Sequence, residues 1–331
     1  MKKAIKIILI ILLVMVAGIA AIGFYVKKAL PDVGAPEELT IERTPARIER
    51  GKYLANHVTL CMDCHSVRDW SLHAGPPIPG PMGGGGERFG EEIGIPGTIY
   101  SRNITPYGIG NWTDGELFRA ITTGVSRDGH ALFPLMPYAN YGKMDREDIY
   151  SIISYIRTLP AVKKDIPPAE LNFPVNFIVN TMPQKAAFTT RPDSLDEIAY
   201  GRYMINAAAC MDCHSQFDDK GNMVPGTEFG GGREFIFPGG IVTSANLTTD
   251  PTGILASLTR EGFIRRFKEY TDSSYQPEKV NPTDFNTPMP WMMYANMTEK
   301  DLGAIYAYLK TVKPMVNEVI KFRKKEAVVK K

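Results

Sequence analysis

The sequence has 331 residues, of which 44% are hydrophobic and 22% are charged. A chain of this length forms about two domains, and its composition supplies enough apolar side chains for packed cores. The net charge of +2 argues against nucleic acid as a partner, because nucleic-acid-binding proteins carry a strong excess of basic residues.

The first predicted element is a membrane-spanning helix within residues 1–28. Ile7 to Val26 form twenty consecutive uncharged, mostly aliphatic residues. At about 1.5 Å per helical residue they cross a hydrocarbon core of about 30 Å. The small residues near the end of this run keep a cleaved signal peptide open as an alternative. In both cases we expect the rest of the chain to be exported.

Two copies of the pentapeptide CMDCH, at 61–65 and 210–214, contain all four cysteines. A redox dithiol, a zinc site, a disulfide and covalently attached haem all use paired cysteines. The histidine after each pair favours haem, because a dithiol or a four-cysteine zinc site leaves both imidazoles without a role. In haem attachment the thiols form thioethers and the adjacent imidazole binds iron. The sequence therefore predicts two covalently attached haem c groups.

The segments around the two pentapeptides also repeat. Residues 48–56 match 198–206, and residues 136–158 match 289–311 without a gap. We therefore expect two similar units, each with a helix before CMDCH, loops around the haem and a terminal helix. Few strands are expected, so the predicted fold class is all-α.

Each matched C-terminal segment has the pattern of an amphipathic helix. Apolar residues stand at the i, i+3, i+4, i+7 spacing from Ile149 to Ile156 and from Leu302 to Leu309. Asp145 and Thr298 occupy the expected N-cap positions.

The spacing of these motifs divides the chain into five parts. A stretch with five prolines lies between the repeats and predicts a connector that rests against a domain surface. Six basic residues within 321–331 predict a solvated tail, with a docking patch as the alternative. The predicted parts are a membrane anchor at 1–28, haem units at 41–165 and 194–316, a linker at 166–193 and a basic tail at 317–331.

Met136 and Met289 are the candidate distal iron ligands. They occupy matched positions of the repeat, and each precedes a proline that limits backbone freedom. A Met at such a position also commonly fills a gap in the core. A shorter gapped pairing selects Met292 instead, but the ungapped match is longer and favours Met289.

The remaining histidines are weaker candidates for ligation. His57 and His73 stand too near the proximal histidine to reach the opposite face of a haem, and His130 has no counterpart in the second repeat.

Each unit also has a glycine run, at 83–90 and 229–235. Glycine allows backbone to approach a flat cofactor closely, so we interpret these runs as loops at the haem edge, with ordinary surface turns as the alternative. Arg88 and Arg233 are candidate partners for the haem propionates.

Residues 41–316 resemble a membrane-anchored dihaem cytochrome c with two tandem class I cytochrome c domains. The resemblance rests on the paired CxxCH motifs and on the MPY and MPW segments followed by MDREDI and MTEKDL. It implies that thioethers form at Cys61, Cys64, Cys210 and Cys213, that His65 and His214 are proximal ligands, and that Met136 and Met289 are distal ligands.

The resemblance also implies a function. We expect electron transfer on the periplasmic side of a bacterial inner membrane, between a dehydrogenase or quinol-oxidising complex and an acceptor such as a terminal oxidase. No small-molecule substrate and no catalysis are expected, because both axial positions of each iron are occupied. Two alternatives stay open: a cytochrome subunit of a dehydrogenase or respiratory complex, and a dihaem peroxidase, which the matched methionines disfavour.

Overall fold

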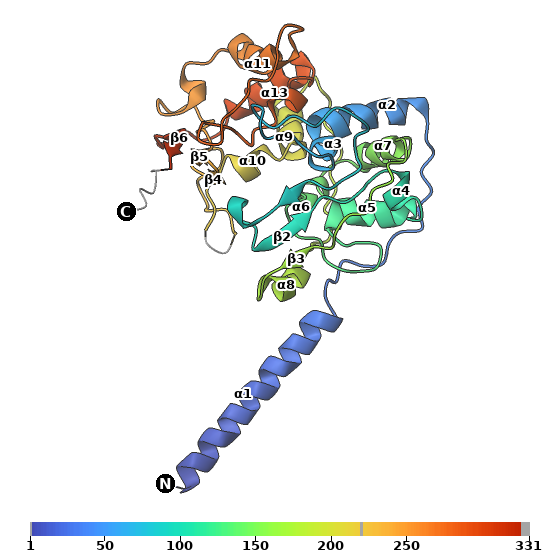
Figure 1. Ribbon diagram of the computed structural model, residues 1–331, viewed down its shortest axis with the longest axis vertical. Coiled ribbons are helices and arrows are strands. Elements are labelled where there is room, and N and C mark those ends of the chain that lie inside the picture. The colour runs from blue at the N-terminus through green and yellow to red at the C-terminus, as the bar shows by residue number, and fades with distance from the viewer. Residues whose placement is uncertain (1, 219–220, 326–331) are drawn as a thin grey trace.

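Helix α1 (Lys2–Lys28) projects away from the body that contains the rest of the chain (Figure 1). The computed structural model describes residues 2–218 and 221–325. Within these residues, α1 is the one helix long and apolar enough to cross a membrane. A signal sequence meets the same criterion, so the finding agrees with both alternatives for the N-terminal segment.

The two repeats contain matching sets of helices: one before CMDCH, one turn at CMDC, one turn after Met-Pro, and a terminal helix. The first repeat has α2 (Pro45–Tyr53), α3 (Cys61–Cys64), α4 (Pro106–Ile109), α5 (Asp114–Thr123), α6 (Tyr138–Tyr141) and α7 (Arg146–Ile156). The second has α9 (Glu197–Ala207), α10 (Cys210–Cys213), α11 (Arg260–Lys268), α12 (Trp291–Tyr294) and α13 (Glu299–Leu309). Between them lies α8 (Val175–Ile178), and single turns of tighter or wider helix are η1 (Leu54–Val58), η2 (Glu91–Ile93), η3 (Val179–Thr181), η4 (Ile254–Ala256) and η5 (Glu269–Thr271).

The described residues also form two small antiparallel sheets, with strand orders β1-β2-β3 and β4-β5-β6. The strands are β1 (Arg88–Phe89), β2 (Gly97–Tyr100), β3 (Glu170–Leu171), β4 (Glu234–Phe237), β5 (Gly240–Thr243) and β6 (Phe322–Lys324). Gly97 pairs with Leu171, and Val242 pairs with both Phe235 and Phe322. The chain is therefore mainly helical, as expected, with short strands that the sequence analysis did not anticipate. Strands of two to four residues are too short to show a period of two.

The first helix of each repeat crosses the terminal helix at a glycine. A β-carbon at Gly51 would stand 1.8 Å from the carbonyl oxygen of Ser151, and one at Gly201 would stand 1.9 Å from that of Ala304. Any larger residue would separate the two backbones. The matched glycines therefore set how closely α2 packs on α7 and α9 packs on α13.

The terminal helices bury the faces that the sequence predicts. The apolar residues Ile149, Ile152 and Ile153 are at most 1% exposed, and Leu302 and Leu309 are equally buried. The predicted N-caps are confirmed as well. The Asp145 carboxylate accepts a hydrogen bond from the Glu147 amide (2.8 Å), and the Thr298 hydroxyl accepts one from the Asp301 amide (3.1 Å).

The two repeats exchange a tyrosine contact in both directions. The Tyr203 hydroxyl, on α9, donates to the Asp148 carboxylate near the start of α7 (2.7 Å). At the matched position of the other repeat, the Tyr53 hydroxyl, on α2, donates to Asp301 near the start of α13. Each repeat therefore stabilises the terminal helix of the other. The two hydrogen bonds are equivalent, as in a contact with approximate twofold symmetry.

Asp148 is the most enclosed carboxylate of this contact, with a side chain that is 1% exposed. It pairs with Arg50 (2.9 Å) and Arg191 (2.7 Å) in addition to Tyr203. Burial alone would raise the pKa of Asp148, but the hydrogen bond and charge of Arg50, together with Tyr203 and Arg191, outweigh burial and hold that pKa below its usual range. The folded protein therefore favours the ionised carboxylate.

The connector lies against the first repeat. The Phe188 ring packs on Phe118 with centroids 5.2 Å apart, and the Ala187 amide donates to the Gly142 carbonyl (2.8 Å). The described part of the C-terminal tail is likewise attached to the second repeat, because β6 pairs with β5. Residues 326–331 of the predicted basic tail lie outside the described residues.

Replacing Gly201 with Ala tests the close helix crossing. We expect Gly201→Ala to lower the free energy of unfolding by about 1–3 kcal/mol, because the new methyl group must push α9 away from α13. Denaturant unfolding followed by circular dichroism measures the change. Gly262→Ala in α11 is the matched control. A β-carbon at Gly262 meets the flexible Leu258 side chain at 3.1 Å, which can move aside. Alanine is also the better helix former, so this substitution should not destabilise the protein. Equal destabilisation by both substitutions would contradict the role of the crossing.

The lowered pKa of Asp148 predicts that the protein loses stability in acid. A carboxylate with a lowered pKa contributes stability that is fully present above its unfolded pKa and is lost as the pH falls through the folded pKa. We expect the denaturant midpoint of the unsubstituted protein to fall steeply between about pH 4 and pH 2. Asp148→Asn should be less stable at pH 7, by up to about 3 kcal/mol, and should depend less on pH in that range. Glu147→Gln, at the exposed pair with Arg47, should change little.

Candidate functional site

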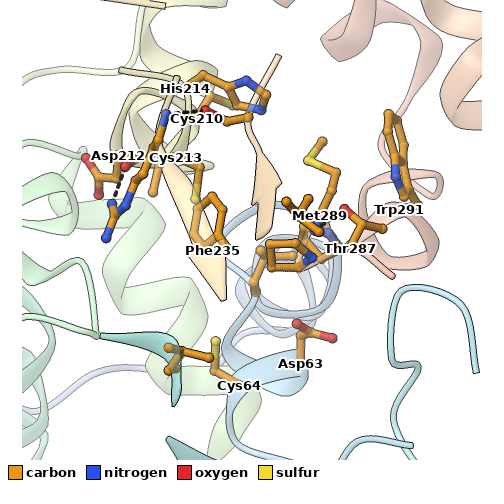
Figure 2. A pocket seen from close by; sticks show the side chains of 18 of the residues that line it. Asp63, Cys64, Cys210, Asp212, Cys213, His214, Phe235, Thr287, Met289 and Trp291 are labelled. Carbon is orange, nitrogen blue, oxygen red and sulfur yellow. Dashed lines mark hydrogen bonds between the residues drawn. The ribbon is translucent and has the colours of Figure 1, made fainter. Parts of the chain in front are cut away.

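A cavity of about 1760 Å³ lies between the two repeats. Pockets for a single small ligand typically measure about 300–1,000 Å³, so this space is large enough for two cofactors side by side. Figure 2 shows Cys213 and His214 on one wall and Met289 on another, with Cys64 across the space. The predicted site residues that line the cavity are Cys64 and Met136 from the first repeat and Cys210, Cys213, His214 and Met289 from the second.

Two of the eight predicted site residues, Cys61 and His65, do not line this cavity. Cys61 packs against the hydrophobic core, with its sulfur 3.3 Å from the Thr59 hydroxyl. His65 follows Cys64 directly at the end of α3 and is fixed by contacts of its own. The structure thus brings the site of the second repeat together more fully than that of the first.

Each CMDC segment forms one helical turn that begins after a residue in the left-handed conformation. These residues are Leu60 (φ 56°) and Ala209 (φ 51°). Such a conformation is uncommon for residues other than glycine and marks a local constraint. The amide of the following histidine bonds to the carbonyl of the first cysteine, at 2.9 Å in α3 and 3.0 Å in α10. The turn therefore holds the two cysteines of each pair within one helical turn, directly before the histidine.

Both histidines of the pentapeptides are oriented in the same way. The Nδ1 atom of His65 lies 2.6 Å from the Arg102 carbonyl oxygen, and that of His214 lies 2.8 Å from the Ala245 carbonyl oxygen. A carbonyl only accepts, so Nδ1 carries the proton and the Nε2 lone pair is left for another partner. Burial lowers the pKa of both imidazoles and keeps them neutral. This is the arrangement of a histidine that ligates a metal through Nε2.

The surroundings of the four thiols disfavour the thiolate form. Burial raises the pKa of all four and brings Cys64 and Cys210 to about 12. A thiol that stays protonated at neutral pH is a poor nucleophile. Within residues 2–218 and 221–325, no group of three or more His, Cys, Asp or Glu side chains is arranged to hold a metal ion. The orientation of the adjacent imidazoles, rather than the thiols, favours haem attachment among the alternatives for CMDCH.

Met136 and Met289 occupy equivalent places in the cavity wall. The amide two residues after each methionine bonds to the methionine carbonyl, at 2.7 Å for Tyr138 and 2.8 Å for Trp291. Met292, the alternative in the second repeat, is absent from the cavity wall among the described residues. The structure therefore favours Met289 over Met292.

Two tyrosines that the sequence analysis did not single out brace the pentapeptides. Tyr141 donates to the Thr59 carbonyl (2.5 Å), and Tyr294 donates to the Ala208 carbonyl (2.6 Å). Both rings line the cavity, and burial raises both pKa values far above the usual range. The signal was present in the repeat, since Tyr141 and Tyr294 occupy matched positions.

The glycine runs bond to the backbone of the two pentapeptide histidines. The Gly85 amide donates to the His65 carbonyl (2.8 Å), and the Gly231 amide donates to the His214 carbonyl (2.9 Å). Both glycines have φ 69°, and a β-carbon at Gly85 would stand 2.6 Å from the Arg102 backbone. Close approach of two backbone segments therefore requires these glycines. The interpretation of the runs as loops at a haem edge stays a prediction.

Two buried hydroxyls in the cavity wall test whether the site suits a haem. Tyr138 is 2% exposed and Thr243 is 8% exposed, and neither hydroxyl has a hydrogen-bond partner among the described residues. An unpaired buried hydroxyl costs about 1–3 kcal/mol, so both point to a polar group that enters the cavity. The carboxylates of a porphyrin are such groups. The residues therefore fit haem. The cavity is apolar, each repeat supplies paired thiols, an oriented imidazole and a methionine sulfur, and the two hydroxyls can donate to carboxylates.

The two candidate propionate partners, Arg88 and Arg233, make different contacts. Arg88 lines the cavity but pairs with Glu92 (2.6 Å). Arg233 donates to the Asp212 carbonyl and lies over the Phe235 ring, 5.4 Å from its centroid. Figure 2 shows Phe235 beside Cys213 in the cavity.

The other histidines lie in different surroundings. His130 is largely exposed and pairs with Asp128 (3.1 Å). His57 lies beside the Tyr53 ring, and His73 reaches the cavity edge beside Phe285. Unlike His65 and His214, none of these three histidines directly follows a pair of cysteines.

Several known proteins that are similar to this chain are cytochromes or cytochrome subunits of dehydrogenases. It is 32% identical over 190 residues to an alcohol dehydrogenase (quinone) cytochrome c subunit of Gluconacetobacter polyoxogenes, and 33% identical over 193 residues to a fructose dehydrogenase cytochrome subunit of Gluconobacter japonicus. Each match covers 53% of this chain and 37% of the relative, so the chain spans little more than a third of those subunits.

A third relative matches more of its own length. A "diheme cytochrome c-type" protein of Cereibacter sphaeroides is 26% identical over 265 residues, which is 76% of this chain and 81% of that protein. No protein-family model matches the sequence. The resemblance to c-type cytochromes is confirmed by these relatives, which imply covalently bound haem c.

Proposed function

We propose that this chain, whose relatives are cytochrome c subunits of dehydrogenases and a dihaem cytochrome, carries two covalently attached haem c groups and transfers electrons between redox proteins. The observation that carries the proposal is the matched geometry of the two repeats. In each, an imidazole whose Nδ1 donates to a backbone carbonyl follows a pair of cysteines, and a methionine stands in the cavity wall.

The chain's own residues have separate roles in this proposal. The thiols of each CMDC turn would attach the porphyrin, the Nε2 atoms of His65 and His214 would bind iron, and the Met136 and Met289 sulfurs would be the second protein ligands. When bound, haem c supplies a one-electron couple whose potential depends on these axial ligands. The apolar wall excludes water, and with a histidine and a methionine bound to each iron no site would be left for a substrate. The protein is therefore a carrier rather than an enzyme.

The repeats would form two tandem cytochrome c domains, at 41–165 and 194–316, with helices around each haem and the small sheets at the margins. Their shared cavity supports short-range electron passage between two haems, because residues from both repeats line one space. The relative described as a diheme protein also supports the number two.

The proposed location is the outer face of a bacterial inner membrane, with α1 retained as a single-pass anchor. The length and apolar surface of α1 support this location. The proposed partners are an electron-donating dehydrogenase or quinol-oxidising complex and an acceptor such as a terminal oxidase. Permanent membership in a dehydrogenase complex is the second candidate, because several relatives are cytochrome subunits of dehydrogenases.

Haem count tests the core of the proposal. Mass spectrometry of the denatured full-length chain should show two added haem groups, and resting spectra should be low-spin. Cys61→Ser with Cys64→Ser should remove one haem, and Cys210→Ser with Cys213→Ser should remove the other. A chain without added porphyrin would refute the proposal. A five-coordinate high-spin haem that reacts with peroxide would instead support a peroxidase.

Replacement of the distal methionines tests the ligand assignment. Imidazole stabilises ferric iron more than a thioether does, so we expect Met289→His to lower one reduction potential and Met136→His to lower the other. Redox titration with spectra recorded throughout measures both. Met292→His is the matched control and should leave both potentials unchanged. If Met292→His lowered a potential while Met289→His did not, the assignment would be reversed.

A further inference from the structure

A second apolar segment lies beside α1. Residues 171–184 are fourteen consecutive uncharged residues in the connector. They form the end of β3, the one-turn helix α8 and the turn η3, and both α8 and η3 contact α1 (Figure 1). The connector therefore places an uncharged stretch where the helix leaves the body.

This contact lies on the apolar part of α1. The Phe177 ring lies 4.0 Å from where a β-carbon at Gly23 would stand, and Val26, one turn further along α1, is buried. Gly23 stands four residues before Lys27, the first charged residue after the apolar run. At about 1.5 Å per residue, the contact lies about 6 Å on the apolar side of that charge.

The same segment exposes large apolar side chains. Phe173 is 84% exposed and Ile178 is 42% exposed, whereas Val179, the first residue of η3, is buried. Exposed aromatic and aliphatic residues next to a spanning helix are typical of the membrane–water interface. Lys27, Lys28 and Lys185 flank the apolar residues and are exposed, which suits anionic phospholipid headgroups.

The segment is also firmly connected to the first repeat. Leu171 pairs with Gly97 in the first sheet, the Asn172 amide donates to the Pro96 carbonyl (2.9 Å), and the Asn172 side chain donates to Glu91 (2.7 Å). Residues 173–182 therefore continue directly from a strand paired with β2, and β2 pairs with β1 in the cavity wall.

We infer that residues 171–184 form a second membrane contact, in which α8 and η3 lie in the lipid interface beside α1 and fix the orientation of the body against the bilayer. This inference rests on the proposed retention of α1 as an anchor. A single helix followed by an extended segment leaves the body free to tilt, whereas two contacts at one side restrict it.

Lipid photo-cross-linking of the full chain tests this inference. The chain is reconstituted in vesicles of phosphatidylcholine and phosphatidylglycerol that contain a phosphatidylcholine with a diazirine on its acyl chain, and labelled peptides are identified by mass spectrometry. We expect label on α1 and on residues 171–184. The peptide around Leu195 is the internal control. Leu195 is also 84% exposed, but it precedes α9, which Figure 1 shows on the side of the body away from α1.

Substitutions sharpen the test. Phe173→Glu with Ile178→Glu should reduce label on residues 171–184 severalfold while label on α1 stays unchanged, because both residues are exposed and the fold is retained. Leu195→Glu with Val316→Glu changes two other exposed apolar residues and should leave the labelling pattern as it is. Unchanged haem spectra check the folding of both variants.

Two results would overturn the inference, and they differ in what else they refute. Label on α1 with no more label on 171–184 than around Leu195 would refute the second membrane contact and leave the proposed anchor standing. Absence of label on α1 as well would refute both the second contact and the proposed anchor.

Discussion

The hydrogen bond between each pentapeptide histidine and a backbone carbonyl is the interaction on which the rest of the site depends. It fixes the imidazole tautomer, and the carbonyl is itself held in place. Arg102 packs against Gly85, and the side chain of the next residue, Asn103, donates to the Val162 carbonyl beyond the terminal helix (2.8 Å). In the second repeat Asn246 donates to the Met315 carbonyl in the same way (2.8 Å). The direction of each Nε2 is therefore determined by segments far from it in sequence.

The contacts between the repeats provide the second level of organisation. A tyrosine of each repeat donates a hydrogen bond to an aspartate in the first turn of the other repeat's terminal helix. Each terminal helix in turn packs on the helix that precedes CMDCH in its own repeat. The wall of the shared cavity is thus built from both repeats at once. Since protein interiors resist small changes in packing, the two walls are held at a nearly fixed separation.

Local signals in the sequence predicted the parts of the molecule that depend on neighbouring residues. Asp145 and Thr298 cap the terminal helices as expected, and the matched Met-Pro pairs led to Met136 and Met289, both of which line the cavity. The sheets were not anticipated, because β3 and β6 pair across long sequence separations and contain two or three residues. The contact of Tyr53 with Asp301 was also beyond sequence reasoning, since 248 positions separate the two. The roles of the site residues and the domain boundaries remain predictions.

The exchange of tyrosines between the repeats has the form of an isologous interface, in which one patch on each partner is complementary to the same patch on the other. Two separate copies of such a unit would assemble only above a threshold concentration. Joining them through the connector makes the encounter intramolecular, at an effective concentration in the millimolar range for a short linker. The fused chain therefore keeps this contact between its repeats at any dilution. The sequences of the two repeats can differ at every position outside the contact.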